Sequence, residues 1–112
     1  MGKLKYSTLK EIIYTLLQLV PIGKVTTYKF LSEIVGKSPR LIGKVLAENK
    51  EIIVIPCHRV IKHSGDIGGY SLGVEFKKKL LEIEGLKIYS VGSKVVVSKK
   101  NIVSLKEILE LR

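Results

Sequence analysis

The chain is poor in cysteine, proline and tryptophan. Its 112 residues contain one cysteine, three prolines and no tryptophan. One cysteine cannot form an internal disulfide, which excludes a small secreted scaffold held together by disulfides. No apolar run is long enough to span a bilayer, and we recognise no signal peptide. We therefore interpret the protein as cytoplasmic, with no membrane association.

Acidic residues are also scarce. Twenty Lys and Arg stand against ten Asp and Glu, which gives a formal net charge of +10. The excess favours a polyanionic partner, nucleic acid first, although a solvated lysine coat would give the same count. Residues 51–85 carry five basic and five acidic residues, whereas residues 1–50 carry nine and three. A neutral middle segment thus lies between two basic arms.

The apolar pattern predicts a mainly α fold with a small β-hairpin. Apolar residues make up 46% of the chain, enough for one modest core. From Ser7 to Val20 they repeat at helical spacing, with Thr8 and Glu11 placed as a capping box. We expect Pro21 to follow the end of this helix.

Two short helices are predicted next. The first fits Thr27 to Val35 and stops at Gly36. The second restarts at Ser38, the expected N-cap, with Pro39 at the first helical position. Two helices joined by a tight turn are typical of a winged-helix-like, helix-turn-helix domain, whose second helix is the candidate for a nucleic-acid groove.

The remaining segments alternate between strand and helix signals. "EIIVI", residues 51–55, is a β-branched run, and the glycine-rich residues 63–71 are typical of a loop. "EFKKKLLEIEG" predicts a helix closed by Gly85. Gly92 and Ser93 suit the turn of a hairpin, and Asn101 is the expected cap of a last helix.

The cysteine lies in "IPCHRVI", residues 55–61. A cysteine supplies little thiolate at pH 7 unless a nearby base or positive charge lowers its pKa, and His58 and Arg59 are candidates. A histidine in this role needs an acid to fix its tautomer. Spacing does not choose among the nearby acids, which are Glu51, Asp66, Glu75, Glu82 and Glu84. The local pattern alone is consistent with either a structural or a reactive role for Cys57.

A longer ordered pattern surrounds this cysteine. "GKVTTYKFLSEIVG", "SPRLIGKVLAEN", "IPCHRVI", "SGDIGGYS" and "KKKLLEIEG" follow one another, and with the first helix they cover about residues 8–86. The set resembles the DNA-binding and active-site domain of O6-alkylguanine-DNA alkyltransferases, the methylated-DNA–protein-cysteine methyltransferases. The resemblance implies a monomeric DNA repair protein that flips O6-alkylguanine out of double-stranded DNA. It transfers the alkyl group irreversibly to its cysteine, acts once, and uses no cofactor or metal.

The resemblance also implies roles for single residues. Cys57 corresponds to the alkyl acceptor, His58 to its base acting through water, and Glu84 to the acid behind the histidine. Asn49 corresponds to the asparagine that braces the turn before the cysteine. Tyr28 corresponds to the tyrosine that helps to rotate the nucleotide and protonates the leaving guanine. From the residues alone, Tyr28 as ordinary core and Glu84 as a solvated acid are the alternatives.

On the DNA side, Arg40 corresponds to the arginine that enters the duplex where the flipped base was stacked; a simple phosphate contact is its alternative. The other residues expected at DNA are Ser38, Gly43 and Lys44, with Lys44 and Val45 larger than the residues usual nearby. Those expected at the substrate pocket are Ile55, Pro56, Tyr70, Ser71 and Leu72. We expect His63 on the surface, and a solvated face at Lys77, Lys78 and Lys79, although Lys77 resembles a pocket-side lysine of the family.

The chain departs from the family pattern in three ways. Most members carry a further N-terminal domain, which we expect to be missing here. Residues 50–52 replace usual prolines. Residues 87–112, a hairpin and a helix, lie outside the resemblance, and we expect them to extend the domain formed by residues 1–86. Two other functions are open: an alkyltransferase-like protein that flags lesions without transfer, whose relatives replace the cysteine, and a DNA-binding regulator with a structural cysteine.

Overall fold

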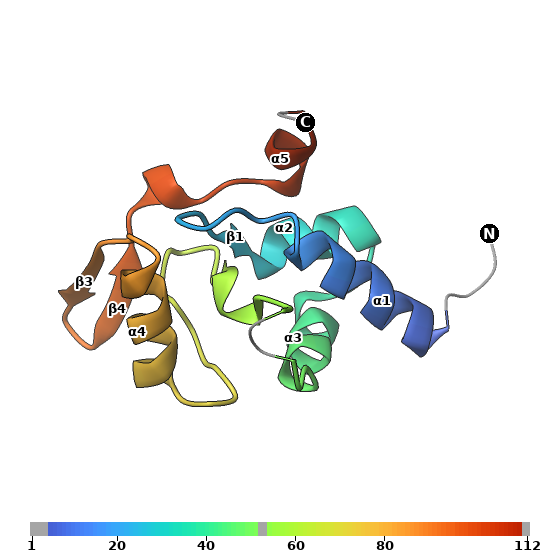
Figure 1. Cartoon of the computed structure of the whole chain (residues 1–112), viewed down its shortest axis with the longest axis horizontal. Coiled ribbons are helices and arrows are strands. Elements are labelled where there is room, and N and C mark those ends of the chain that lie inside the picture. Colours follow the sequence, from blue (N-terminus) through green and yellow to red (C-terminus); the bar gives the residue numbers. More distant parts are fainter. Residues whose placement is uncertain (1–4, 52–53, 111–112) are drawn as a thin grey trace.

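The computed structural model describes residues 5–51 and 54–110. Helices and short strands alternate along this part of the chain (Figure 1). The helices are α1 (Tyr6–Leu17), α2 (Tyr28–Val35), α3 (Pro39–Ala47), α4 (Val74–Ile83) and α5 (Leu105–Glu110), with 3-10 turns η1 (Cys57–Arg59) and η2 (Lys99–Asn101). The strands are β1 (Thr26–Thr27), β2 (Val60–Ile61), β3 (Ile88–Val91) and β4 (Lys94–Val97). The expected fold class, mainly α with a small β-hairpin, is confirmed.

The helix-turn-helix is built by local rules that the sequence displays. The Thr27 hydroxyl accepts a hydrogen bond from the Phe30 N–H at 3.1 Å and so caps α2. Gly36 ends α2 in the left-handed conformation, with φ of 69°, which favours a residue without a side chain. Ser38 then caps α3 by accepting from the Leu41 N–H at 3.2 Å, and Pro39 is the first helical residue. The predicted pair of helices is confirmed.

Two apolar clusters hold the elements together. The first joins α1, α2, α3 and η1 through the buried residues Leu9, Ile13, Leu17, Val20, Leu31, Ile42, Val45, Leu46, Cys57, Val60 and Ile108. The second joins β1, β2, α4 and the hairpin through Val25, Ile61, Ile67, Leu81, Leu86 and Val97. Burial of these aliphatic side chains is the main stabilising contribution. It fixes the cysteine at the edge of the first cluster.

The segment after α4 is bonded to the earlier part of the chain. The strands form a parallel pair, β1–β2, and an antiparallel hairpin, β3–β4, and Asp66, in the loop after β2, forms an isolated bridge with Val96 of β4. After η2, the Val25 N–H donates to the Asn101 carbonyl at 3.0 Å, and the Val103 N–H donates to the Val25 carbonyl at 2.8 Å. Ile108 of α5 lies in the first cluster. Residues 87–110 thus contribute to both cores.

Two predicted helix caps are wrong. The helix α1 begins at Tyr6, which puts Thr8 inside its first turn, and its N-cap Lys5 forms no side-chain cap. The capping box of Thr8 and Glu11 is therefore not formed. Asn101 belongs to η2, and α5 begins only at Leu105, where the Ser104 hydroxyl accepts from the Glu107 N–H at 3.1 Å. Ile102 pairs with Val25, which keeps the segment between η2 and α5 extended, so that the last helix begins at Leu105 and not directly after Asn101.

The β-branched run at residues 51–55 does not provide a strand in its described part. Ile52 and Ile53 lie outside the described residues, and the Ile55 N–H donates to the Glu51 carbonyl at 2.8 Å. The strand comes after the cysteine, as β2. Within the described residues, no helix is long and apolar enough to cross a membrane.

Candidate active site

The single cysteine occupies a turn between the two clusters. Cys57 begins η1, directly after Pro56 and before β2. Its N–H donates to the Ile55 carbonyl at 2.8 Å, and the Arg59 N–H donates to the Pro56 carbonyl at 3.0 Å. The Cys57 side chain is 5% exposed. Backbone hydrogen bonds therefore fix the turn that carries the thiol, and Cys57 lines the cavity described below.

Asn49, just after α3, braces this turn. Its side-chain N–H group donates to the Ile55 carbonyl at 2.9 Å and to the Cys57 sulfur at 3.3 Å. Its side-chain carbonyl accepts from the Glu51 N–H at 2.9 Å. A donor aimed at the sulfur fixes its position and draws its electron density toward the amide. Asn49 thus positions the sulfur and polarises it.

His58 and Arg59 share one carboxylate, that of Glu84 at the end of α4. His58 Nε2 lies 3.0 Å from Glu84 Oε2, and the Arg59 guanidinium donates to both carboxylate oxygens at 2.9 and 2.7 Å. A third Arg59 N–H donates to the Val20 carbonyl at 2.8 Å. The other histidine nitrogen, Nδ1, is buried and has no partner among the described residues. Since the carboxylate accepts the Nε2 proton, neutral His58 presents Nδ1 as a base.

The charge states of this group suit that role. Burial lowers the pKa of His58 below its ordinary value, although the Glu84 carboxylate works in the opposite direction. Burial would raise the pKa of Glu84, but hydrogen bonds from Arg59 and His58 bring it below its ordinary value. At neutral pH Glu84 is therefore ionised and His58 is an uncharged base.

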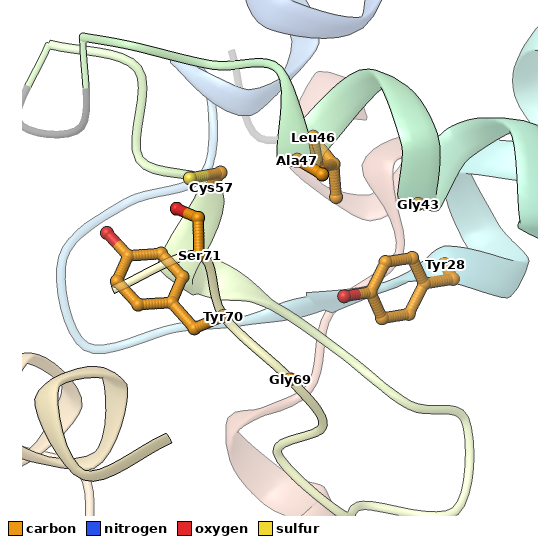
Figure 2. A pocket seen from close by; sticks show the side chains of 8 residues that line it. All are labelled: Tyr28, Gly43, Leu46, Ala47, Cys57, Gly69, Tyr70 and Ser71. Atoms are coloured by element: carbon orange, nitrogen blue, oxygen red, sulfur yellow. The ribbon is translucent and has the colours of Figure 1, made fainter. Parts of the chain in front are cut away.

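A cavity of about 380 Å³ opens beside the sulfur. Figure 2 shows Tyr70 and Ser71 next to Cys57, and Tyr28 across the cavity with its hydroxyl directed into it. Burial, and then the nearby charge of an ionised Cys57, raises the pKa of Tyr28 and raises the pKa of Tyr70 to about 12. Both phenols are therefore protonated at neutral pH. Each can donate a proton or a hydrogen bond to a bound molecule.

A second cavity, of about 460 Å³, adjoins the first and is basic. Tyr28, Gly43 and Gly69 line both cavities. The other residues lining the second are Lys29, Pro39, Arg40, Lys62 and His63. The Arg40 side chain is exposed in the first turn of α3. A cationic surface thus leads into the cavity that holds the thiol.

Comparison with known proteins identifies the family that shares this arrangement. The family model described as "6-O-methylguanine DNA methyltransferase, DNA binding domain" matches residues 8–86. The chain belongs to this family. The matched block contains all of α1 except its first two residues, the whole of α2 to α4, and every residue of the thiol turn and of the two cavities.

Curated relatives carry the same family name. A methylated-DNA–protein-cysteine methyltransferase of Saccharolobus islandicus is 48% identical over 84 residues, which are 75% of this chain and 52% of the relative. One of Metallosphaera sedula is 46% identical over 83 residues, 74% of this chain and 53% of the relative. The chain therefore spans about half the length of the curated relatives that it matches.

Solved structures agree with the assignment. The O6-methylguanine-DNA methyltransferase of Pyrococcus kodakaraensis is 47% identical and superimposes with a TM-score of 0.64, over 68% of this chain and 45% of that one. An S. pombe ATL protein, solved with damaged DNA containing O6-carboxymethylguanine, reaches a TM-score of 0.81 over 90% of this chain and 99% of that one. At 23% identity the second likeness shows the fold alone.

The cavity beside Cys57 is lined by some of the residues expected at the substrate pocket and not by others. Cys57, Tyr28, Tyr70 and Ser71 line it, and so does Gly43, a residue expected at DNA. Three further lining residues were missed: Leu46, Ala47 and Gly69. The helical spacing of Gly43 and Ala47 was the available signal, because residues four apart share one face of α3.

Of the remaining expected residues, three pocket residues are absent from this lining, and the DNA-contact role of two others, Ser38 and Lys44, stays a prediction. Ile55 and Pro56 pack behind the thiol turn, and Leu72 is 49% exposed; the pocket lining does not include them. Ser38 is exposed at the start of α3. The Lys44 ammonium lies 5.2 Å from the centre of the Tyr6 ring, toward the end of α3 that faces α1. Val45, considered as a groove residue, is fully buried in the core.

Lys77 is the largest departure from expectation. The predicted solvated face is wrong at this residue, because Lys77 is fully buried. Its ammonium donates to the Val60 carbonyl at 2.7 Å, to the Gly69 carbonyl at 3.2 Å and to the Ile67 carbonyl. Burial lowers the pKa of Lys77 to about 8, while the charge of an ionised Cys57 opposes this shift. Lys77 ties the pocket loop to β2, and the only sequence signal was the family resemblance.

Proposed function

We propose that this protein repairs DNA by moving an alkyl group, chiefly methyl, from O6 of guanine to the sulfur of Cys57. One observation carries the proposal: the Cys57 sulfur, with the Asn49 N–H on it at 3.3 Å, lies at the wall of a cavity whose other side presents the Tyr28 hydroxyl. A nucleophile and an acid therefore face one space of about 380 Å³. That space is open to a flat purine between small and aromatic side chains.

The chemistry follows from the residues around the sulfur. Neutral His58 takes the thiol proton through a water molecule, and Glu84 and Arg59 hold the imidazolium that forms. The thiolate attacks the alkyl carbon in line with the carbon–oxygen bond, so a carbon–sulfur bond forms as that bond breaks. The guanine leaves with the bonding electrons and receives a proton from Tyr28. Solvent then returns the proton of His58 to the phenolate.

The step happens once for each protein molecule. A thioether on Cys57 is stable, and no group around the cavity is placed to cleave it. The protein is therefore consumed in proportion to the lesions it repairs. The rate of alkyl transfer is therefore expressed as a single-turnover rate constant.

The substrate must leave the stacked duplex before it reaches the sulfur. Arg40 lines the basic cavity that adjoins the pocket and lies in the first turn of α3, which supports an approach of DNA along this side. We assign Arg40 to the gap left by the extruded base, because a long cationic side chain there lowers the cost of unstacking. Double-stranded DNA containing O6-alkylguanine is thus the partner that this site fits.

A second function is lesion binding without transfer. It is favoured by the fold likeness to the S. pombe ATL protein, which extends over 90% of this chain. Under this alternative the pocket holds the alkylated base and other repair proteins act on it. The intact cysteine, with its histidine, carboxylate and asparagine contacts, favours transfer.

Intact-mass measurement separates the two functions. The protein is mixed with duplex DNA containing O6-methylguanine, and the masses of the whole chain and of the peptide containing Cys57 are measured by mass spectrometry. We expect one methyl group on Cys57, and none in Cys57→Ser or with unmodified DNA. Circular dichroism of Cys57→Ser shows whether the variant is folded. Tight lesion binding by the natural chain with no adduct would exclude transfer and favour the alternative.

A further inference from the structure

A third cavity lies outside the chemistry described so far. It measures about 240 Å³ and is lined by Thr27, Phe30, His63, Lys99 and Ile102. His63 also lines the basic cavity that contains Arg40. The two cavities therefore meet at His63. Lys99 and Ile102 come from the segment after residue 86, beyond the part of the chain that the family model matches.

Backbone hydrogen bonds fix Lys99 in this place. The Ile102 N–H donates to the Lys99 carbonyl at 3.1 Å, which closes η2. The next residues pair with Val25, where Asn101 accepts and Val103 donates at 3.0 and 2.8 Å. Figure 1 shows the chain after β4 returning past β1 on its way to α5. Lys99 is thus held against the start of α2 by the fold itself.

The two adjoining cavities form one basic track. Their cationic or potentially cationic members are all exposed: Lys29, Arg40, Lys62, His63 and Lys99. Among the described residues, neither lining contains a carboxylate. The floor at the Lys99 end is mostly apolar, with Phe30 and Ile102. A charged rim above an apolar floor suits a chain of phosphates joined by sugars.

We infer that Lys99 and His63 bind phosphates of the duplex that flanks the lesion, so that the segment after α4 enlarges the DNA interface of the helix-turn-helix. The inference rests on the proposed function, since the flank belongs to the duplex that holds the alkylated guanine. It assigns a binding role to a lysine of the C-terminal extension. It also assigns one to a histidine that the alkyl-transfer chemistry does not use.

The test compares two lysines of the extension. Lys99→Gln and Lys94→Gln remove the same charge, the second on the exposed start of β4, away from the three cavities described here. Both are made in full-length Cys57→Ser protein, so that no alkyl transfer occurs. Binding to a duplex containing O6-methylguanine is measured by fluorescence anisotropy over a range of salt concentrations.

We expect Lys99→Gln to reduce the slope of log K against log salt by about 0.9, the value for one lost phosphate contact. At about 0.1 M salt the same counterion effect makes binding roughly eightfold weaker. Lys94→Gln should keep the slope of the parent protein. Equal slopes for the two variants would overturn the inference. If urea unfolding shows that Lys99→Gln is destabilised, His63→Gln is the second variant, and it should bind the duplex more weakly than Lys94→Gln does.

A second measurement locates the contact on the duplex. The duplex is shortened on one side of the lesion or on the other. The effect of Lys99→Gln should disappear for one shortened duplex and persist for the other. Persistence with both would mean that Lys99 acts on any anion, such as free phosphate or an acidic peptide, and would overturn the inference. If the parent protein binds no duplex, the proposed function falls as well; if it binds and Lys99 has no effect, only the inference falls.

Discussion

Asn49 Nδ2 lies 3.3 Å from the Cys57 sulfur, and the same nitrogen donates to the Ile55 carbonyl at 2.9 Å. One amide therefore serves both the nucleophile and the backbone turn that carries it. The Asn49 side chain is only 6% exposed, so water cannot readily replace these bonds. Positioning of the turn and polarisation of the sulfur are consequently coupled in this protein.

The Asn49→Ala variant should lose both effects. Removal of the amide leaves the Glu51 N–H without its partner and the Ile55 carbonyl with only the Cys57 N–H, at a cost of about 1–3 kcal/mol in the free energy of unfolding. The thiol should also react more slowly, by roughly tenfold, with iodoacetamide and with O6-methylguanine in DNA. Urea unfolding and the single-turnover rate measure the two effects. The control is Asn101→Ala, whose amide donates only to the Gly23 carbonyl at 3.4 Å. Equal iodoacetamide rates in the two variants would contradict the role of Asn49.

Stability should fall on mild acidification because His58 is buried as a neutral base. Its pKa is lowered by burial from an ordinary value of 6.5, so the unfolded chain binds the proton more readily just below that pH. The stability from neutral His58 is complete above 6.5 and is lost as the pH drops through the folded pKa. Glu84, whose pKa is also lowered, adds a further loss below its ordinary value of 4.5.

Urea unfolding at about pH 7.5, 6 and 5 measures this dependence. His58→Gln should remove the decline between about pH 6.5 and 5, and the exposed control His63→Gln should retain it. The single-turnover rate of the natural chain should fall over the same interval, since a protonated His58 cannot accept the thiol proton. A natural chain that gains stability on going from pH 7 to pH 5 would show that the imidazole is not held neutral.

Local signals predicted the parts of the fold that are decided locally. Gly36, Ser38 and Pro39 each meet a backbone requirement of the helix-turn-helix, and all three act as the sequence indicates. The predicted capping box is wrong because α1 begins at Tyr6, so Thr8 lies inside the first turn and cannot be the N-cap. Asn101 failed for another reason: pairing between Val25 and Ile102, far apart in the chain, overrides its capping preference.

The site was predictable in its residue types more than in its contacts. Spacing left five acids as partners for His58, and only the packing of α4 brings Glu84, 26 positions away, to 3.0 Å from the ring. The burial of Lys77 depends likewise on three backbone carbonyls from β2 and the following loop. Neither relationship has a periodic signature. The family resemblance pointed to both residues, while composition and spacing did not.

Lys77→Met should destabilise the protein and disturb the pocket. Methionine has a similar length, but it leaves the carbonyls of Val60, Ile67 and Gly69 without a donor. Loss of hydrogen bonds from a charged group should cost about 1.5–3 kcal/mol in the free energy of unfolding. The loop that carries Tyr70 should become more mobile, and amide hydrogen exchange at Gly69 and Tyr70 should accelerate.

The matched control for Lys77 is two residues further along the same helix. Lys79 is exposed, so Lys79→Met should change the free energy of unfolding by less than about 0.5 kcal/mol. Both variants are compared by urea unfolding and by the single-turnover rate on methylated duplex DNA. Similar unfolding curves for the two would mean that the three carbonyls do not need the ammonium, and that the pocket loop is held by other contacts.

Arg40→Ala should slow alkyl transfer from duplex DNA by roughly tenfold to a hundredfold, the effect of about 1–3 kcal/mol. The exposed Arg40 is assigned to the gap that the extruded guanine leaves, so its removal raises the cost of unstacking.

Single-stranded DNA containing the lesion is the comparison, because extrusion of the guanine from it leaves no gap in a base-paired duplex for Arg40 to fill. The defect of Arg40→Ala should therefore shrink to the few-fold loss expected of one missing phosphate contact. Single-turnover rates on the two substrates measure this ratio. An equal loss on both would reduce Arg40 to a phosphate ligand, because only a residue that replaces the base distinguishes a paired stack from a single strand.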